Sequence, residues 1–266
     1  MRGVDARKFL QGQLSQDVLG LRDDRVEWAG LHNPQGRVLA LLRLVPAGPT
    51  DVLCVLPREL IEDTLAGLRK FLLRAKATLA DESSAWQLEG LADDSQLPAT
   101  VGSARREGEI ILWRHASDGR VLRLSPRPPS PTASASVAAS DALAAWQRAD
   151  VAAGIPEVLL RTRGEFVAQM LNLDALGGIS FNKGCYTGQE VIARAHYRGR
   201  VKRRAQRFAL PAGALPSPGE SVTLADGRSA QVLLAAPTSS NVEILAIAPT
   251  IEGDTLALPL SYPLPE

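Results

Sequence analysis

The stretch of sequence that decides how this chain is organised is Lys183-Gly184-Cys185-Tyr186-Thr187-Gly188-Gln189-Glu190. It leads into an apolar run, and Thr187 stands three residues before Glu190, which is the spacing of a capping box. We therefore predict a helix with Thr187 at its N-cap, whose free amide groups and positive dipole end point back toward Cys185. Lys183 adds a positive charge two residues from the thiol. Both effects favour thiolate over thiol, which is the condition for a reactive cysteine.

Spacing alone leaves a second interpretation of Cys185 open. A structural cysteine in a loop before a helix would have the same neighbours, and the chain has no second cysteine at the spacing of a redox CxxC pair. The other cysteine, Cys54, lies in the apolar run 51–56 and is predicted to be a buried core residue. We expect Cys185 to react faster than Cys54 with a thiol reagent.

The cysteines and histidines give no support for a metal site. His32, His115 and His196 lie far apart in the sequence, and no pair of potential ligands has the spacing of a zinc site. The two cysteines lie in such different settings that a disulfide framework is not indicated either. We predict no metal site, and no iron–sulfur cluster held by the chain itself.

The amino-acid composition limits the classes of protein to which this chain can belong. The chain has 266 residues, of which 45% are hydrophobic, and this is enough for two or three compact units. Its formal net charge of +1 excludes a polyanion mimic and a general nucleic-acid binder. No apolar stretch is long enough to cross a bilayer, and the first residues lack the apolar centre of a signal peptide. We expect a cytoplasmic protein without a membrane partner.

The first half of the chain alternates helical and strand patterns. The turn sequence Asn33-Pro34-Gln35-Gly36 joins two strand patterns into a hairpin, because proline presets φ and glycine closes the turn. The mixture of patterns indicates an α+β unit. Helices are predicted over 5–19 and 58–73, and strands over 26–31, 38–45, 52–56, 77–79, 86–91, 110–113 and 121–124.

The second half opens with a Pro/Ala/Ser-rich stretch, 126–140, which we predict to be a linker. A helix is predicted from Ser140 or Asp141 to Ala153, and the Gly- and Asn-rich stretch 164–184 is a long loop of a kind that is often functional. Beyond Arg200, short strand patterns recur at regular intervals, which is typical of a small β-barrel or sandwich. Its predicted strands are 206–210, 221–224, 231–235, 242–247 and 255–258.

The motif at 183–190 resembles that of the YgfZ family, which is related to the glycine-cleavage T protein, an aminomethyltransferase. Further segments on both sides resemble the same family, so the likeness covers most of the chain. These segments are 9–13, 153–156, 169, 172–173, 176–181, 193–194 and 197–199.

This resemblance implies a T-protein-like fold, in which three domains form a ring around a central pocket and the last domain is an antiparallel β-barrel. The implied central, folate-binding domain is discontinuous and comprises residues 1–45 and 141–200. A ferredoxin-like α+β domain would span 46–125, the linker 126–140, and the C-terminal barrel 201–266.

The resemblance also implies a function. Family members bind tetrahydrofolate or a one-carbon derivative non-covalently, and they support the assembly or repair of iron–sulfur enzymes and, through them, tRNA modification. Contacts with iron–sulfur client or assembly proteins would be transient. No reaction is established; a folate-dependent, transferase-like activity would use Cys185, with Lys183 beside it. The alternatives are a true aminomethyltransferase and a non-catalytic folate sensor or scaffold.

The family also implies folate contacts. Trp146 precedes the Ala-Gly-Ile-Pro segment, and an aromatic face suits a flat pterin, although the same residue fits an amphipathic helix equally well. A second family tryptophan lies on an N-terminal strand that we do not expect among these residues, either because the start is truncated or because the pocket is built differently. The other implied folate-binding residues are Gln169, Asn172, Tyr186, Gln189, Glu190, Arg194 and Arg198.

A basic stretch follows the motif, with seven Lys/Arg residues and no acid between 194 and 207. Arg194 and Arg198 share one helical face and are placed to pair with the carboxylates of a folate tail. A solvated basic surface and an RNA-facing patch fit the same residues. RNA held in this way would bind weakly and in a salt-sensitive manner.

Overall fold

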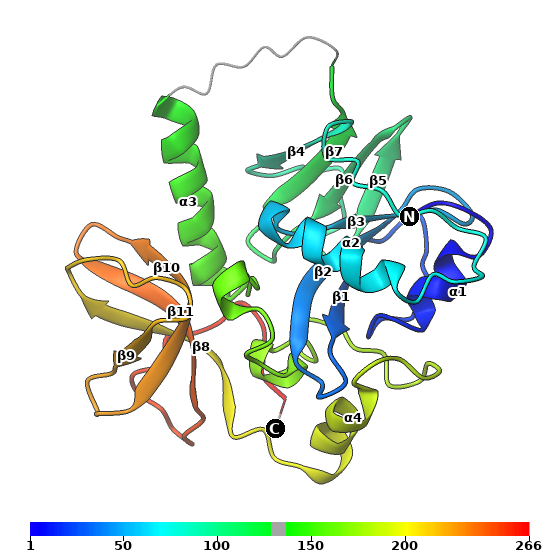
Figure 1. Cartoon of the computed structure of the whole chain (residues 1–266). Coiled ribbons are helices and arrows are strands. Elements are labelled where there is room, and N and C mark those ends of the chain that lie inside the picture. Colours follow the sequence, from blue (N-terminus) through cyan, green and yellow to red (C-terminus); the bar gives the residue numbers. More distant parts are fainter. Residues whose placement is uncertain (129–136, 266) are drawn as a thin grey trace.

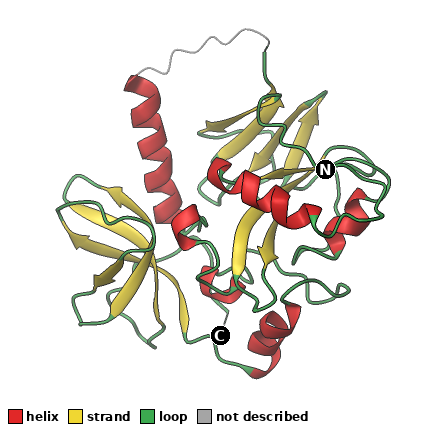
Figure 2. Cartoon of the chain, viewed as in Figure 1, coloured by secondary structure: helices red, strands yellow, loops and turns green. Residues whose placement is uncertain are grey.

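Three antiparallel sheets hold the strands of residues 1–128 and 137–265, the parts of the chain that the computed structural model describes. The third sheet lies away from the second and has the long helix α3 (Val137–Ala153) beside it (Figures 1 and 2). The predicted mixture of helices with antiparallel strands is confirmed. Most of the predicted linker 126–140 lies outside the described residues, and α3 already begins at Val137.

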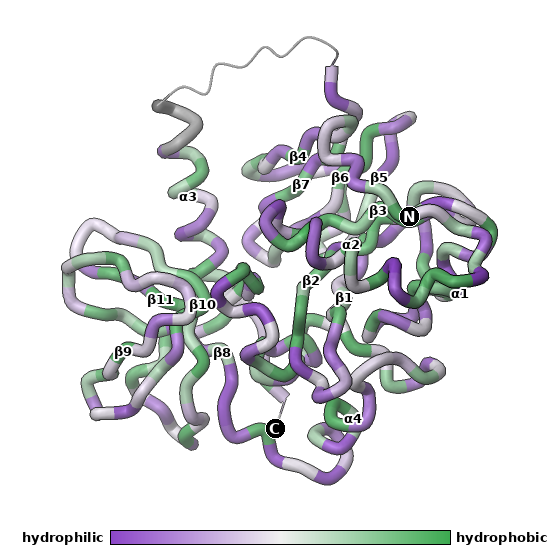
Figure 3. The backbone as a smooth tube through the Cα atoms, in the orientation of Figure 1, coloured by the Kyte–Doolittle hydropathy of each residue, from purple (hydrophilic) through white to green (hydrophobic). Residues whose placement is uncertain are grey.

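The first sheet has the order β1-β2-β3, with β1 at Glu27–His32, β2 at Val38–Pro46 and β3 at Val52–Val55. The predicted hairpin is confirmed: Gly36 adopts φ +72°, and the Asn33 side chain accepts hydrogen bonds from the amides of Gln35 and Arg37. β2 has eight of its nine residues buried, and its tube is largely hydrophobic in Figure 3. It is therefore the central strand of the core.

The first helix is shorter than predicted, since α1 covers only Ala6–Gln11. The apolar spacing that suggested a helix to residue 19 is real, because Leu14 and Val18 are fully buried. However, the backbone of Leu14 forms a bridge with Leu31, and the amide of Ser15 donates to the carbonyl of Gly30. Pairing with β1 thus replaces the helical hydrogen bonds of this segment.

The second sheet has the order β4-β7-β6-β5. Its strands are β4 (Trp86–Leu91), β5 (Ala104–Glu107), β6 (Ile110–Arg114) and β7 (Val121–Pro126). The charged strand β5 was not predicted, and the strand predicted at 77–79 is reduced to one bridge between Arg2 and Thr78. The helix predicted over 58–73 is a 3-10 turn, η1 (Arg58–Leu60), followed by α2 (Ile61–Arg69).

The remaining elements are η2 (Leu160–Thr162), η3 (Ala168–Leu171), α4 (Gln189–Arg198), β8 (Arg203–Pro211), β9 (Ser221–Thr223), β10 (Ser229–Pro237) and β11 (Asn241–Pro249). The third sheet has the order β8-β11-β10-β9. The strand predicted at 255–258 contributes one bridge, from Leu258 to Arg207. A closed C-terminal barrel and a three-domain ring therefore stay predictions.

One hydrophobic cluster joins these parts. Its buried side chains come from α1, β1, β2, η3 and α4, and also from the inner positions of β8, β10 and β11. The first and third sheets thus share a core, and the loop that carries the 183–190 motif is packed against it. No helix within residues 1–128 and 137–265 is both long and apolar enough to cross a membrane.

Helix α3 packs against two sheets at once. It contacts β10 and β11, and its Trp146 side chain lies on Gly90 of β4. A Cβ atom at Gly90 would lie 2.5 Å from atoms of the indole ring, so only glycine allows this approach. Trp146 therefore lies at the junction of α3 with the second sheet.

We predict that Gly90→Ala lowers the free energy of unfolding by about 1–3 kcal/mol, because the new methyl group overpacks the indole. Gly67→Ala is the matched control. Gly67 lies in α2 with open space around its Cα, so alanine there should raise the free energy of unfolding by about 0.5–1 kcal/mol through helix propensity. Urea unfolding measures both, and a neutral Gly90→Ala would contradict the packing described.

Candidate functional site

The ammonium of Lys183 fastens the motif loop to the end of α1. Its Nζ donates to the carbonyl oxygens of Gln11 at 2.6 Å, Leu14 at 2.6 Å and Gln16 at 2.8 Å. A lysine has three N–H donors, so all of them are occupied and none is left for the Cys185 thiol. Burial lowers the pKa of Lys183 to about 8. A catalytic role for Lys183 stays a prediction, whereas its three hydrogen bonds show that it positions the motif loop.

The helix after the motif begins later than predicted. The predicted capping box, with Thr187 as the N-cap and Glu190 three residues on, is therefore wrong. α4 starts at Gln189, and its N-cap is Gly188, with φ +82° and no side-chain cap. A Cβ atom at Gly188 would lie 2.6 Å from the carbonyl oxygen of Asn33, in the β1–β2 turn. The helix start is therefore set by close packing on this turn. The Gln189 side chain instead accepts a hydrogen bond from the amide of Tyr186 at 3.1 Å.

The two cysteines differ in exposure in the expected direction. Cys185 is exposed, in the loop between Lys183 and α4. Cys54 is half-buried on β3, and burial raises the pKa of its thiol. Faster reaction of Cys185 stays a prediction.

Two of the predicted folate contacts, Gln169 and Asn172, are buried links between elements. Gln169 Nε2 donates to the carbonyl of Ile192 in α4 at 2.7 Å, and Asn172 Nδ2 donates to the carbonyl of Ala205 in β8 at 2.8 Å. Asn172 adopts φ +56°, which asparagine tolerates better than most residues. Oε1 of Gln169 is buried without a partner, so it is the atom of this pair still free to bind a ligand.

The remaining predicted contacts near the motif divide into one buried and three exposed residues. Tyr186 is buried with its ring 6.1 Å from that of His32, and burial raises the pKa of its hydroxyl to about 12. Glu190, Arg194 and Arg198 are exposed on α4.

Trp146 is surrounded by charged and polar side chains. The guanidinium carbon of Arg120 lies 4.6 Å from the indole centroid, and the imidazole of His115 lies 5.3 Å from it. Asp150, one helical turn beyond Trp146, accepts from Arg120 Nη1 at 2.7 Å and lies 3.0 Å from His115 Nε2. Asp150 therefore holds both residues against the indole.

Two further charges lie within reach of Asp150. Arg43 of β2 packs its guanidinium over the Trp28 ring, and burial lowers its pKa to about 10. Burial raises the pKa of Glu157 to about 7, while the nearby charge of Arg43 opposes this rise. We call Arg43, His115, Arg120, Trp146, Asp150 and Glu157 the junction cluster, since they come from β2, the β6–β7 connection, α3 and the loop after it.

Three buried polar atoms of the junction cluster have no hydrogen-bond partner: His115 Nδ1, Arg120 Nη2 and Glu157 Oε1. Buried polar atoms are nearly always hydrogen-bonded, so three orphans in one cluster point to a ligand or to water. A small cavity of about 70 Å³ adjoins the cluster at Arg43 and His115. Of these residues only Trp146 was predicted from sequence. One available signal was Arg43, a charged residue within the apolar pattern of a buried strand.

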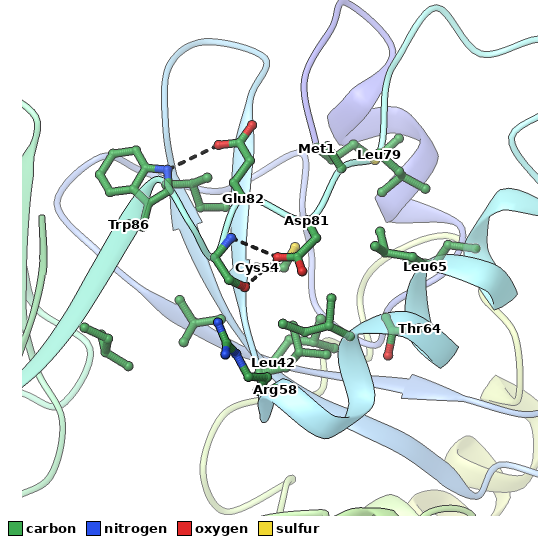
Figure 4. Close-up of a pocket in the computed structure, with 18 of the residues that line it drawn as sticks. Met1, Leu42, Cys54, Arg58, Thr64, Leu65, Leu79, Asp81, Glu82 and Trp86 are labelled. Atoms are coloured by element: carbon green, nitrogen blue, oxygen red, sulfur yellow. Dashed lines mark hydrogen bonds between the residues drawn. The ribbon is translucent and has the colours of Figure 1, made fainter. Parts of the chain in front are cut away.

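A larger cavity, of about 450 Å³, lies between α2, β3 and the start of β4, with Leu42, Leu65 and Leu79 among its apolar lining (Figure 4). Its two carboxylates already accept hydrogen bonds from other residues of the lining. Asp81 accepts from Ser83, and Glu82 accepts from Trp86 Nε1 at 3.2 Å. None of the orphan buried side-chain atoms of the described residues lines this cavity.

The basic stretch 194–207 divides into two groups. Arg204 forms an ion pair with Asp174, Arg207 with Glu243, and Arg203 donates to the carbonyl of Ile247. These three side chains belong to β8 of the third sheet and are already engaged by the partners named. The exposed cations are Arg194, Arg198, Arg200 and Lys202.

The structure does not gather all predicted folate contacts in one place. Trp146 of α3 lies against Gly90 of the second sheet, whereas the motif loop leads into α4, which lies away from that sheet in Figure 1. The pairing of Arg194 and Arg198 with a folate whose pterin lies on Trp146 therefore stays untested. In residues 1–128 and 137–265, no group of three or more His, Cys, Asp or Glu side chains is placed to hold a metal ion.

Comparisons with known proteins give a consistent result. The tRNA-modifying protein YgfZ of Pectobacterium carotovorum subsp. carotovorum (strain PC1) is 34% identical over 261 residues, covering 92% of this chain and 78% of that protein. The protein of the same name from Escherichia coli O157:H7 (strain EC4115 / EHEC) is 33% identical over 240 residues, covering 85% of this chain and 73% of its own. No family model matches the chain.

Among solved structures, the glycine cleavage system aminomethyltransferase T from Bartonella henselae superposes with a TM-score of 0.61. The match covers 93% of this chain and 74% of that chain at 14% sequence identity, so it shows the fold alone. The predicted T-protein-like fold is confirmed at this level.

We predict that Lys183→Met lowers the free energy of unfolding by about 1–3 kcal/mol, because three carbonyl oxygens lose their donors. Lys202→Met is the matched control: Lys202 is exposed, and its loss should change stability by less than about 0.5 kcal/mol. Chemical unfolding of both variants measures the difference. Equal stability of the two would show that the ammonium contacts do not hold the loop.

Proposed function

Because the chain belongs to the family of the tRNA-modifying protein YgfZ, we propose that it is a cytoplasmic tetrahydrofolate-binding accessory protein for iron–sulfur enzymes and, through them, for tRNA modification. Its ligand would be tetrahydrofolate or a one-carbon derivative, bound without a covalent link. Its protein partners would be iron–sulfur client or assembly proteins, held transiently. When bound, such a folate supplies a carrier for one-carbon groups.

The junction cluster is the observation that carries the folate part of this proposal. The pyrimidinone edge of a pterin presents N–H donors beside a carbonyl acceptor, and its rings are flat. The three orphan atoms of the cluster offer the complementary set: Glu157 Oε1 accepts, Arg120 Nη2 donates, and His115 Nδ1 does either according to its tautomer. The donors and acceptors of these residues thus fit a pterin.

Five residues of the junction cluster take part in this proposal. Trp146 provides the aromatic face, and Glu157 and Arg120 bind the polar edge. Asp150 orients His115 and Arg120 through its hydrogen bonds to both. The adjoining cavity of about 70 Å³ is smaller than the roughly 300–1,000 Å³ of typical ligand sites, so we expect the cluster to widen on binding.

The larger cavity is a poorer candidate for the pterin. It has the volume of a ligand site, but its lining is mostly aliphatic, and its two carboxylates already accept hydrogen bonds, Asp81 from Ser83 and Glu82 from Trp86. A pterin placed there would lose the hydrogen bonds that its polar edge makes in water, which costs binding free energy. The pairing of polar groups, rather than volume, favours the junction cluster.

Cys185 has a separate task. It is exposed in the motif loop, which Lys183 fixes to the end of α1 and which leads into α4, away from the second sheet in Figure 1. An exposed thiol in a fixed loop is accessible to a partner protein, so we assign Cys185 to contact or chemistry with the client. A non-catalytic folate sensor would not need this thiol. Activity of a client enzyme in cells carrying Cys185→Ala therefore separates the two: a loss supports the first, and unchanged activity the second.

Calorimetric titration with tetrahydrofolate and its 5-formyl form tests the folate site. We predict saturable binding by the intact chain and about 5- to 150-fold weaker binding by Trp146→Ala, since loss of stacking costs on the order of 1–3 kcal/mol. Cys185→Ala should bind as the intact chain does.

The matched aromatic control is Trp86→Ala, which removes an indole from the larger cavity instead. It should retain folate binding. No binding by the intact chain, or a loss in Trp86→Ala with none in Trp146→Ala, would contradict the proposed site. Circular dichroism confirms that each variant is folded.

A further inference from the structure

Three aromatic rings meet on the outer side of α4. The rings of Phe181 and His196 are stacked, with centroids 3.8 Å apart and planes inclined by 13°. Tyr197 meets both of them edge-on, at 6.0 Å from Phe181 and 4.7 Å from His196. Tyr197 is 66% exposed, so much of this aromatic group faces solvent.

Four cations lie close to His196 and Tyr197 in the sequence. Arg194, Arg198, Arg200 and Lys202 are exposed, and no carboxylate among the described residues lies within 4.0 Å of their charged groups. This contrasts with Arg204 and Arg207, which lie close by in sequence and are both paired with carboxylates. The positive charge beside the rings is therefore available to an anionic partner.

Helical geometry places part of this set on one face. Arg194, Tyr197 and Arg198 are three and four positions apart in α4, so their side chains project from the same side of the helix. Arg200 and Lys202 lie in the segment between the end of α4 and the start of β8. We call Phe181, Arg194, His196, Tyr197, Arg198, Arg200 and Lys202 the α4 platform.

Exposed aromatic rings beside a row of free cations are the combination that binds single-stranded nucleic acid. Cations neutralise successive phosphates, and an aromatic face stacks on an unpaired base whatever its identity. A double helix would offer only its phosphates, because its bases are already stacked on one another. The exposed tyrosine therefore favours a single strand.

We propose that the α4 platform binds a short single-stranded segment of RNA, with a base stacked on Tyr197 and phosphates against Arg194, Arg198, Arg200 and Lys202. The choice of RNA rests on the proposed link to tRNA modification, whereas the single strand and the anionic backbone follow from the side chains themselves. Phe181 directly precedes the Cys185 loop in sequence and the other platform residues follow it, so RNA and a client protein would be held at the same end of the molecule.

Fluorescence anisotropy with a labelled twelve-residue oligouridine and the full chain tests this proposal. We expect saturable binding that weakens roughly fiftyfold between 50 and 200 mM salt, as about four phosphate contacts require for a single strand. Tyr197→Ala should weaken binding by about 5- to 150-fold, and Tyr197→Phe should retain it because the ring is kept. The pair Arg194→Gln/Arg198→Gln should halve the salt dependence.

The matched control is Arg69→Gln/Lys70→Gln, which removes two exposed cations at the end of α2 and should leave binding unchanged. Absence of binding at 50 mM salt would overturn the proposal. The proposal would also be overturned if both double variants lost RNA affinity equally while Tyr197→Ala kept it. That result would show only a general electrostatic attraction to polyanions, which an acidic protein would share. Tyr197→Ala should still bind tetrahydrofolate, so a failure of this proposal remains distinct from a failure of the folate site.

Discussion

Three backbone carbonyl oxygens around the ammonium of Lys183 hold the functional end of this molecule together. They belong to the end of α1 and the segment after it, which also binds the 177–180 stretch through Ser15 and Gln16. The loop that carries Cys185 is thereby fixed from both sides. The Gly188 backbone, packed on the β1–β2 turn, then sets where α4 begins. A surface loop with such anchors can present a thiol in one defined position.

The two proposed activities, folate binding and contact with macromolecular partners, lie in different parts of the molecule. The junction cluster lies where β2, the second sheet and α3 meet, and its unpaired polar atoms suit a small flat ligand. Cys185 and the α4 platform lie on or next to α4, away from the second sheet in Figure 1, and suit macromolecular partners.

The sequence predicts the local features well and the assembled site poorly. The β1–β2 hairpin was predictable because Pro34 and Gly36 fix its turn locally. Strand β5 was not, because Ala-Arg-Arg-Glu looks like a surface segment until it pairs with β6. The capping box failed because packing on a distant turn overrides a local motif. Among the junction residues, Arg43 alone broke a local pattern; the rest become neighbours only through the fold.

Hydrogen–deuterium exchange of the full chain, with and without 5-formyltetrahydrofolate, tests the central claim most directly. The account predicts that the folate protects amides in residues 113–121 and 146–158, around the junction cluster, and that Trp146→Ala removes this protection. Protection confined to residues 53–68 and 79–88 would instead place the folate in the larger cavity. That result would contradict the argument that unpaired polar atoms, rather than cavity volume, mark the folate site.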